Sequence, residues 1–124
     1  MSKERIVITG IGVISPFGDG VVPFWDALIH GKNGIGKVSL FDASELNCQV
    51  AAECKDFDAT KYMDHKEVKR SDRYTHFAVA AAKLAMQDAG LNESNLIPER
   101  FGVLIGSGVG GMDTIETQAR AFIE

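Results

Sequence analysis

Residues 101–123 combine a short apolar strand, a glycine-rich turn and a helix, and this combination restricts the chain to the α/β class. The strand reads FGVLI, the turn reads GSGVGG, and an apolar stripe then recurs at helical spacing. That stripe consists of Met112, Ile115, Ala119, Phe122 and Ile123. No Gly, Asn or Pro closes the helix before Glu124. We therefore expect the chain to be the front part of a larger protein. The alternative is a small domain with a frayed end.

Two buried strands and one long helix are predicted upstream of this point. Residues 5–11, RIVITGI, form a β-branched run bounded by glycines, and residues 101–106 form a second apolar run. The helix SDRYTHFAVAAAKLAMQDAG begins at Ser71 or Asp72 and ends at Gly90. Its many alanines would let a neighbouring helix or sheet approach closely.

Shorter elements fill the space between these predictions. A short helix is expected to open at Pro23 and to stop at Gly31. Residues 50–54 favour a weak strand, and residues 61–70 favour a short exposed helix or helical turn. The chain contains neither a repeat nor a low-complexity tract, so we treat residues 1–124 as one unit without an internal boundary.

Composition excludes several classes of protein. The 124 residues are 45% hydrophobic and 24% charged, as in ordinary globular domains. A net charge of −4 gives no general attraction to nucleic acid or to an anionic membrane. No apolar run approaches the ~18 residues that a membrane-spanning helix needs. The N-terminus enters a strand almost at once, so we expect no signal peptide and a cytoplasmic protein.

Two glycine motifs point weakly towards nucleotide binding. Thr9-Gly10-Ile11-Gly12 resembles a dinucleotide fingerprint but has Ser15 where the third glycine would stand. Residues 106–111, GSGVGG, satisfy G-x-G-x-x-G between a strand and a helix. The confirming acidic residue, ~20 positions further on, would lie beyond Glu124. A tight strand-to-helix turn is the competing explanation.

A cluster of basic residues is the other candidate site. Lys66, Lys69 and Arg70 lie three to four positions apart, so on a helix they would share one face. A local basic patch on an acidic chain suits an acidic partner protein or a phosphate group. From charge alone, a solvated helix face explains the cluster better, because Asp64 and Glu67 partly neutralise it.

Catalytic and metal sites are not apparent. Cys48 and Cys54 have five residues between them and no histidine close in sequence, which is not a usual zinc pair. No Ser, His and Asp arrangement suggests a triad. We therefore predict no catalytic residue, no metal ligand and no cofactor within this chain.

Four blocks of the sequence together resemble the β-ketoacyl-acyl-carrier-protein synthases, especially the type II elongating enzymes. They span essentially the whole chain, in the family's order. The blocks are VITGIGVISPFGDGVVPFWDALIHGKNGI, FDAS, KDFDATKYMDHKEVKRSDRYTHFAVAAAKLAMQDAGL and FGVLIGSGVGGMDTIETQ. The resemblance also accounts for GSGVGG without a nucleotide.

This resemblance implies a thiolase-type fold, in which two similar α/β halves pack as α-β-α-β-α layers, usually in a homodimer. Residues 1–124 would be the incomplete opening portion of the first half. The implied activity is an acyltransferase reaction of fatty-acid biosynthesis, with no cofactor. An acyl chain moves from acyl carrier protein to an enzyme cysteine, and decarboxylation of malonyl-carrier then yields the carbanion that attacks the thioester.

The resemblance assigns binding roles but no catalytic role. The family's nucleophilic cysteine and two histidines lie further along than Glu124, so the 124-residue chain alone is expected to be inactive. Carrier-protein docking is implied for Lys66, Lys69 and Arg70. Residues Gly108 and Val109 are implied to line the acyl pocket.

Two other interpretations remain open. One is a Rossmann-like dinucleotide-binding module, which a cofactor titration would distinguish from a condensing enzyme. The other is a non-catalytic remnant that binds a carrier protein. In such a remnant the strands at 5–11 and 101–106 would lack neighbours and expose their edges.

Overall fold

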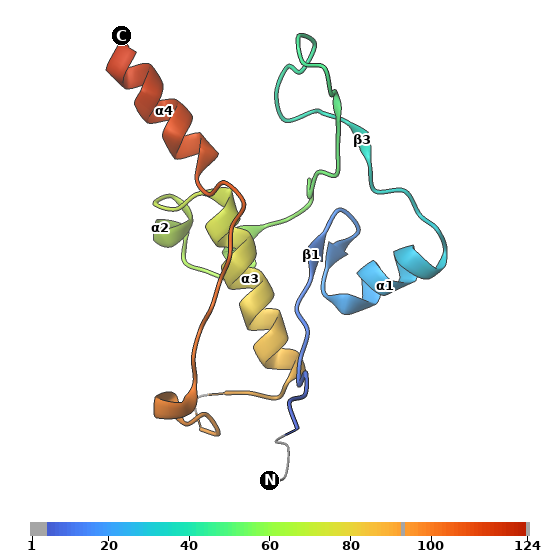
Figure 1. Cartoon of the computed structure of the whole chain (residues 1–124), viewed down its shortest axis with the longest axis vertical. Helices are drawn as coiled ribbons and strands as arrows, with labels where there is room; N and C mark the ends of the chain where they lie inside the picture. The colour runs from blue at the N-terminus through green and yellow to red at the C-terminus, as the bar shows by residue number, and fades with distance from the viewer. Residues whose placement is uncertain (1–4, 93, 124) are drawn as a thin grey trace. The chain divides into compact units, whose positions relative to one another are not determined.

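The computed structural model describes residues 5–92 and 94–123, which fall into two compact units. One unit contains residues 13–58. The other joins the N-terminal segment up to Gly12 to the chain from Ala59 onward. Figure 1 traces these segments by colour, and each unit is described by itself below.

The unit of residues 13–58 begins with a hairpin followed by a helix. Strands β1 (Ile14–Ser15) and β2 (Gly18–Asp19) pair antiparallel, and helix α1 (Val21–Ile29) follows directly. The buried Ser15 hydroxyl fixes the turn, because it donates to the Gly18 carbonyl at 3.1 Å and accepts the Phe17 N–H at 3.2 Å. The helix stops at Gly31, whose φ of +61° favours glycine.

A second small hairpin lies further along this unit. Strands β3 (Gly36–Lys37) and β4 (Val50–Ala51) pair antiparallel, so only two residues of the predicted strand at 50–54 form a strand. The Glu53 carboxylate holds the neighbouring loop, accepting the Ser39 N–H at 3.0 Å, the Ser39 hydroxyl at 2.8 Å and the Leu40 N–H at 3.1 Å. These bonds, led by those from Ser39, lower the pKa of Glu53 to about 2.

This lowered pKa makes the stability of the 36–53 hairpin dependent on pH. A folded-state pKa below the unfolded value of 4.5 stabilises the fold above that value. The stabilisation is lost as the pH falls towards about 2. We expect the side-chain carboxyl resonance of Glu53 to titrate near this lower value in an NMR experiment. We also expect Glu53→Gln to remove the pH dependence of the protection of the Ser39 amide, that is, of its exchange rate relative to an unfolded peptide at the same pH. A midpoint near 4.5 would contradict the assignment.

The other unit is organised around α3 (Arg73–Asp88), preceded by η1 (Ala59–Lys61) and α2 (His65–Val68). The later elements are η2 (Pro98–Arg100) and α4 (Met112–Ile123). The helix predicted from 71 or 72 to Gly90 is confirmed, with Asp72 at its N-cap and a φ of +66° at Gly90. The stripe predicted from 112 to 123 is helical, while Glu124 lies outside the described residues.

Residues 9–12 pack directly on the alanine face of α3. A Cβ built on Gly10 would lie 2.3 Å from the Ala85 carbonyl oxygen, and one on Gly12 would lie 1.9 Å from that of Ala81. The Ile11 N–H donates to the Asp88 carboxylate at 2.9 Å, which pins the segment near the C-terminal end of the helix. A segment does approach the alanine-rich helix closely, but it is a loop and not the helix or sheet that the sequence led us to expect.

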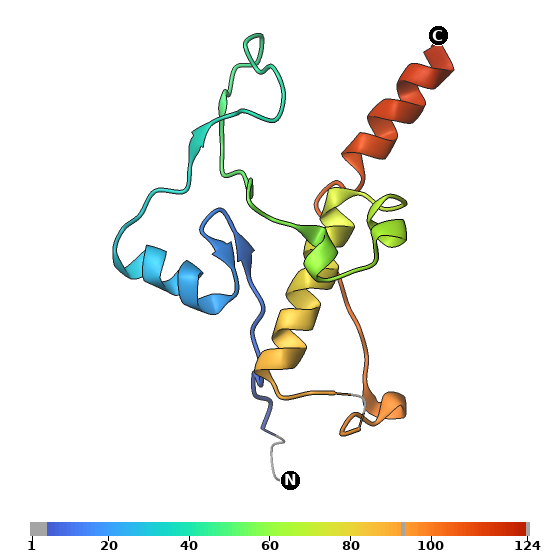
Figure 2. The same cartoon turned by 180° about the vertical axis from the view of Figure 1, so that it is seen from behind.

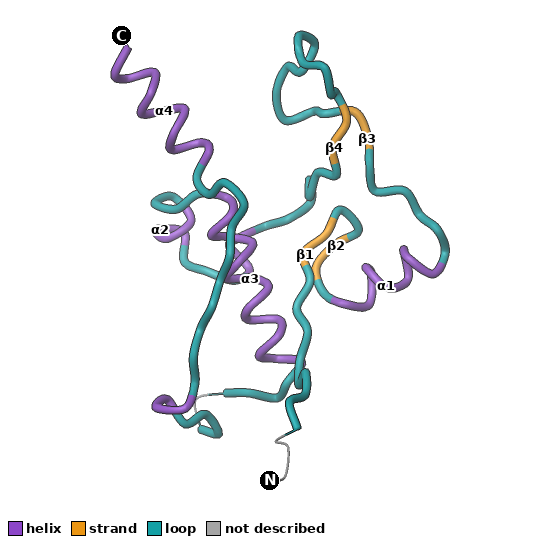
Figure 3. The backbone as a smooth tube through the Cα atoms, in the orientation of Figure 1, coloured by secondary structure: helices purple, strands orange, loops and turns teal. Residues whose placement is uncertain are grey.

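The strands predicted at 5–11 and 101–106 are wrong for the described structure, which has no strand at either place. Figure 2 shows both segments alongside α3, and Figure 3 draws them as loop. They line a shared cavity of about 300 Å³ with Ala82, Ala85 and Met86 of α3. A strand requires a paired backbone, and neither segment pairs with another strand among the described residues. Ile8 and Leu104 are accordingly 85% and 98% exposed.

One helix boundary also differs from prediction. Helix α1 begins at Val21, so Pro23 occupies the third helical position instead of the first. The first-turn N–H groups have no partner inside a helix, so proline is tolerated anywhere in that turn. The short exposed helix or helical turn predicted within 61–70 is found as the four residues of α2, and the extended Asp72, with a ψ of 163°, then starts α3.

Burial in the described structure is confined to small side chains. Ala27, Ala43, Ala59 and Ala80 are the buried apolar residues, and no large side chain between residues 5 and 123, outside position 93, is fully buried. No helix in the described part of the chain combines the length and the apolar character needed to cross a membrane.

Candidate functional site

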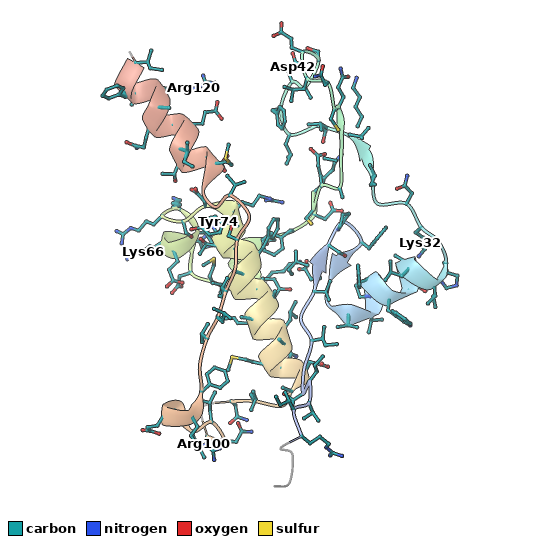
Figure 4. The ribbon with its side chains drawn as sticks, viewed as in Figure 1. Lys32, Asp42, Lys66, Tyr74, Arg100 and Arg120 are labelled. Carbon is teal, nitrogen blue, oxygen red and sulfur yellow. The ribbon has the colours of Figure 1, made fainter. Side chains whose placement is uncertain are left out.

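The three basic residues singled out from the sequence lie together and are exposed. Lys66 lies on α2 (Figure 4). Lys69 is the C-cap of that helix, and Arg70 follows at once. Within the described ranges, no carboxylate lies at ion-pair distance from any of the three. We call these residues the basic triad. Its cations are free to meet an external negative charge.

Two acidic residues close in sequence to the triad, Asp64 and Glu67, form a capping box on α2. Glu67 accepts the backbone N–H of Asp64 at 3.4 Å, which forms half of a capping box at the start of α2. Asp64 and Glu67 keep their charges as caps of α2, but neither forms an ion pair with the basic triad among the described residues.

Helix α2 is tied to the start of α3 by two hydrogen bonds. The Ser71 hydroxyl donates to the Glu67 carbonyl at 2.7 Å, and the His76 ring N–H donates to the Val68 carbonyl at 3.1 Å. These bonds satisfy carbonyls at the C-terminal end of α2. The backbone that carries the basic triad is therefore held against the first turn of α3.

A second connection joins the first turn of α3 to that of α4. Asp72 accepts the Thr114 hydroxyl at 2.6 Å and the Thr114 N–H at 3.4 Å, although these residues lie 42 positions apart. Gly111 occupies the N-cap position of α4, since its carbonyl accepts the Ile115 N–H at 3.0 Å. Glycine has no side chain with which to cap, and Asp72 supplies the missing acceptor.

The glycines of GSGVGG have separate explanations. Gly110 has a φ of +89°, and a Cβ on Gly111 would lie 1.8 Å from an Asp72 carboxylate oxygen. A Cβ on Gly108 would meet no atom within 4 Å, and Val109 is 74% exposed. The pocket roles predicted for Gly108 and Val109 therefore remain predictions.

The first glycine motif is explained by packing. Gly10 and Gly12 stand where the backbone of α3 leaves no space for a Cβ, as described above. The same glycines that resemble a dinucleotide fingerprint thus allow a segment to lie on a helix.

The two cysteines belong to the unit of residues 13–58. Cys48 is exposed and Cys54 is half-buried. In the part of the chain that the structure describes, no three His, Cys, Asp or Glu side chains are grouped to hold a metal ion.

Comparison with known proteins identifies the family. The model of "Beta-ketoacyl synthase, N-terminal domain" matches residues 3–122. The 3-oxoacyl-[acyl-carrier-protein] synthase 2 of Synechocystis is 44% identical over 124 residues, covering all of this chain and 30% of the relative. The enzyme of the same name from Coxiella burnetii is 43% identical over 99% of this chain and 30% of its own length. The chain thus spans about a third of the length of these relatives.

Solved structures give the same answer. A β-ketoacyl synthase from Burkholderia phymatum covers 97% of this chain and 30% of its own, with 27% identity and a TM-score of 0.78. A ketosynthase in complex with a type II PKS acyl-carrier protein covers 98% and 32%, with 26% identity and a TM-score of 0.76. These neighbours confirm the predicted α/β, thiolase-type fold class. The chain therefore belongs to the β-ketoacyl synthase family.

Proposed function

We propose that this chain contributes the N-terminal part of an enzyme of fatty-acid biosynthesis. That enzyme elongates the acyl chain held by acyl carrier protein, by decarboxylative condensation with malonyl-acyl carrier protein. The observation that carries the proposal is the match of the entire chain to two 3-oxoacyl-[acyl-carrier-protein] synthases at more than 40% identity. The enzyme would be a cytoplasmic homodimer without a cofactor. The nucleophilic cysteine and the histidines implied by the resemblance would come from outside residues 1–124.

The basic triad is the proposed docking surface for the acidic carrier protein. Its three cations are exposed, clustered and free of internal ion pairs among the described residues, which supports attraction of a negatively charged partner. A structural neighbour is a ketosynthase in complex with an acyl-carrier protein, which adds support for this class of partner.

A hybrid protein tests the proposed function. Residues 1–124 would replace the corresponding segment of the Synechocystis relative, and we call the product the hybrid enzyme. We expect it to condense acyl-carrier with malonyl-carrier and to release carbon dioxide, while the 124-residue chain alone does neither. A folded hybrid enzyme without condensing activity would overturn the proposal.

The acyl-pocket role of Val109 leads to a prediction about chain length. Val109→Phe in the hybrid enzyme adds an aromatic ring directly after Gly108. We expect kcat/KM for long acyl chains to fall about tenfold relative to short chains, because filled pocket volume excludes the chain end. Val22→Phe is a matched control, since Val22 on α1 is 80% exposed. An unchanged chain-length preference in Val109→Phe would remove Val109 from the pocket.

The two other interpretations of the sequence are tested by binding. A dinucleotide titration of the hybrid enzyme should show no saturable binding, because Gly10, Gly12 and Gly111 have packing roles in this structure. A non-catalytic remnant would bind acyl carrier protein and leave the acyl thioester unchanged.

A further inference from the structure

We infer that Asp72 is a positioning residue that links the carrier-docking segment to the glycine-rich turn carrying Val109. The inference rests on the proposed function, because it assigns a consequence to docking at the basic triad. Its physical basis is a helix cap supplied from a distant part of the chain. The Asp72 carbonyl starts α3, since it accepts the Thr75 N–H at 3.0 Å, while the Asp72 carboxylate turns to the start of α4.

The contact is specific on both sides. Thr114 is the third residue of α4, and its N–H is among those that a helix leaves without an internal partner. Its hydroxyl adds a second donor to the same carboxylate. The absence of a Cβ on Gly111 provides the space, because a Cβ there would overlap the carboxylate at 1.8 Å. Asp72, Thr114 and Gly111 therefore all contribute to this one contact: an acceptor, two donors and the space between them.

The position of this contact gives it a functional meaning. Arg70 lies two residues before Asp72, and His76 of α3 donates to the Val68 carbonyl of α2. On the other side, Val109 lies two residues before Gly111. The segment that would touch the carrier protein and the turn that would touch the acyl chain are thus joined through one carboxylate. Removing it should loosen the turn while leaving the triad's charges in place.

The test is a double-mutant cycle in the hybrid enzyme with two readouts. Asp72→Ala and Gly111→Ala should each lower the melting temperature, but the double variant should lose less than the sum of the two single losses, because the overlap has been removed. If the decreases in melting temperature of the two single variants simply add in the double variant, the inferred contact between Asp72 and position 111 is wrong. Thr114→Val, which keeps the shape and removes the hydroxyl, should reproduce part of the Asp72→Ala effect.

The second readout separates positioning from a merely structural role. Asp72→Ala and Thr114→Val should change the ratio of kcat/KM for long and short acyl chains by about threefold or more. The KM for acyl carrier protein should change less than about twofold. A lower melting temperature with an unchanged ratio would overturn the positioning role. If the hybrid enzyme folds but is inactive, the proposed function fails, whereas the stability cycle still decides whether Asp72 makes this contact.

Discussion

Reversing two charges of the basic triad, Lys66→Glu with Lys69→Glu, is expected to raise the KM for acyl carrier protein about tenfold. Both side chains are exposed, and no internal carboxylate among the described residues neutralises them. An acidic partner would therefore meet repulsion where it now meets attraction. Steady-state kinetics of the hybrid enzyme with acyl-carrier substrate measures the effect. It should shrink at high salt, since a Debye length of about 3 Å at 1 M screens exposed charges.

Two controls separate docking from a general effect of charge. The same variant should show an unchanged KM for a small acyl thioester, which does not touch the triad. Lys37→Glu with Arg100→Glu alters the net charge by the same amount at exposed positions on other elements, β3 and η2. It should leave the KM for acyl carrier protein nearly unchanged. Equal effects on carrier and small thioester, or in both double variants, would count against docking at this surface.

Gly12→Ala is expected to destabilise the hybrid enzyme by about 3 kcal/mol, the upper end of the usual cost of overpacking. The added methyl group would lie 1.9 Å from the Ala81 carbonyl oxygen and 2.6 Å from the Ala85 nitrogen. Both atoms belong to the backbone of α3, so no side-chain rotation relieves the overlap. The segment has to move off the helix and lose the hydrogen bond from Ile11 to Asp88. Urea unfolding measures the difference.

Gly102→Ala is the matched control for this experiment. Gly102 lies in the other extended segment, and a Cβ built on it would meet no atom within 4 Å. The free energy of unfolding of the Gly102→Ala variant should therefore differ from that of the unsubstituted hybrid enzyme by no more than about 0.5 kcal/mol. Similar losses for Gly12→Ala and Gly102→Ala would show that the close approach to α3 does not explain the glycine at position 12.

The sequence was a good guide wherever structure depends on neighbouring residues. The alanine-rich helix α3 begins and ends where Asp72 and Gly90 predict, because caps act within one turn. The exposure of Lys66, Lys69 and Arg70 was also predictable, because charged residues three to four positions apart on a short helix favour a solvated face. Family membership was also accessible, because several separate blocks matched in order.

Features that depend on distant parts of the chain were not accessible in this way. Apolar, β-branched runs at 5–11 and 101–106 have strand character, but a ladder also needs a partner backbone, which composition cannot supply. Asp72 illustrates the same limit. Its position next to α3 predicts a local cap, whereas its carboxylate accepts from Thr114, 42 residues away. Nothing in either segment alone indicates that pairing.

The contact between Asp72 and Gly111 also couples these two positions during evolution. A side chain at position 111 is excluded while the carboxylate occupies that space. The carboxylate ends a flexible side chain, so a substitution at 111 would turn it aside and cost α4 its cap from Asp72. Aspartate at 72 is then no longer useful to α4, and related sequences should keep or lose the two residues as a covarying pair.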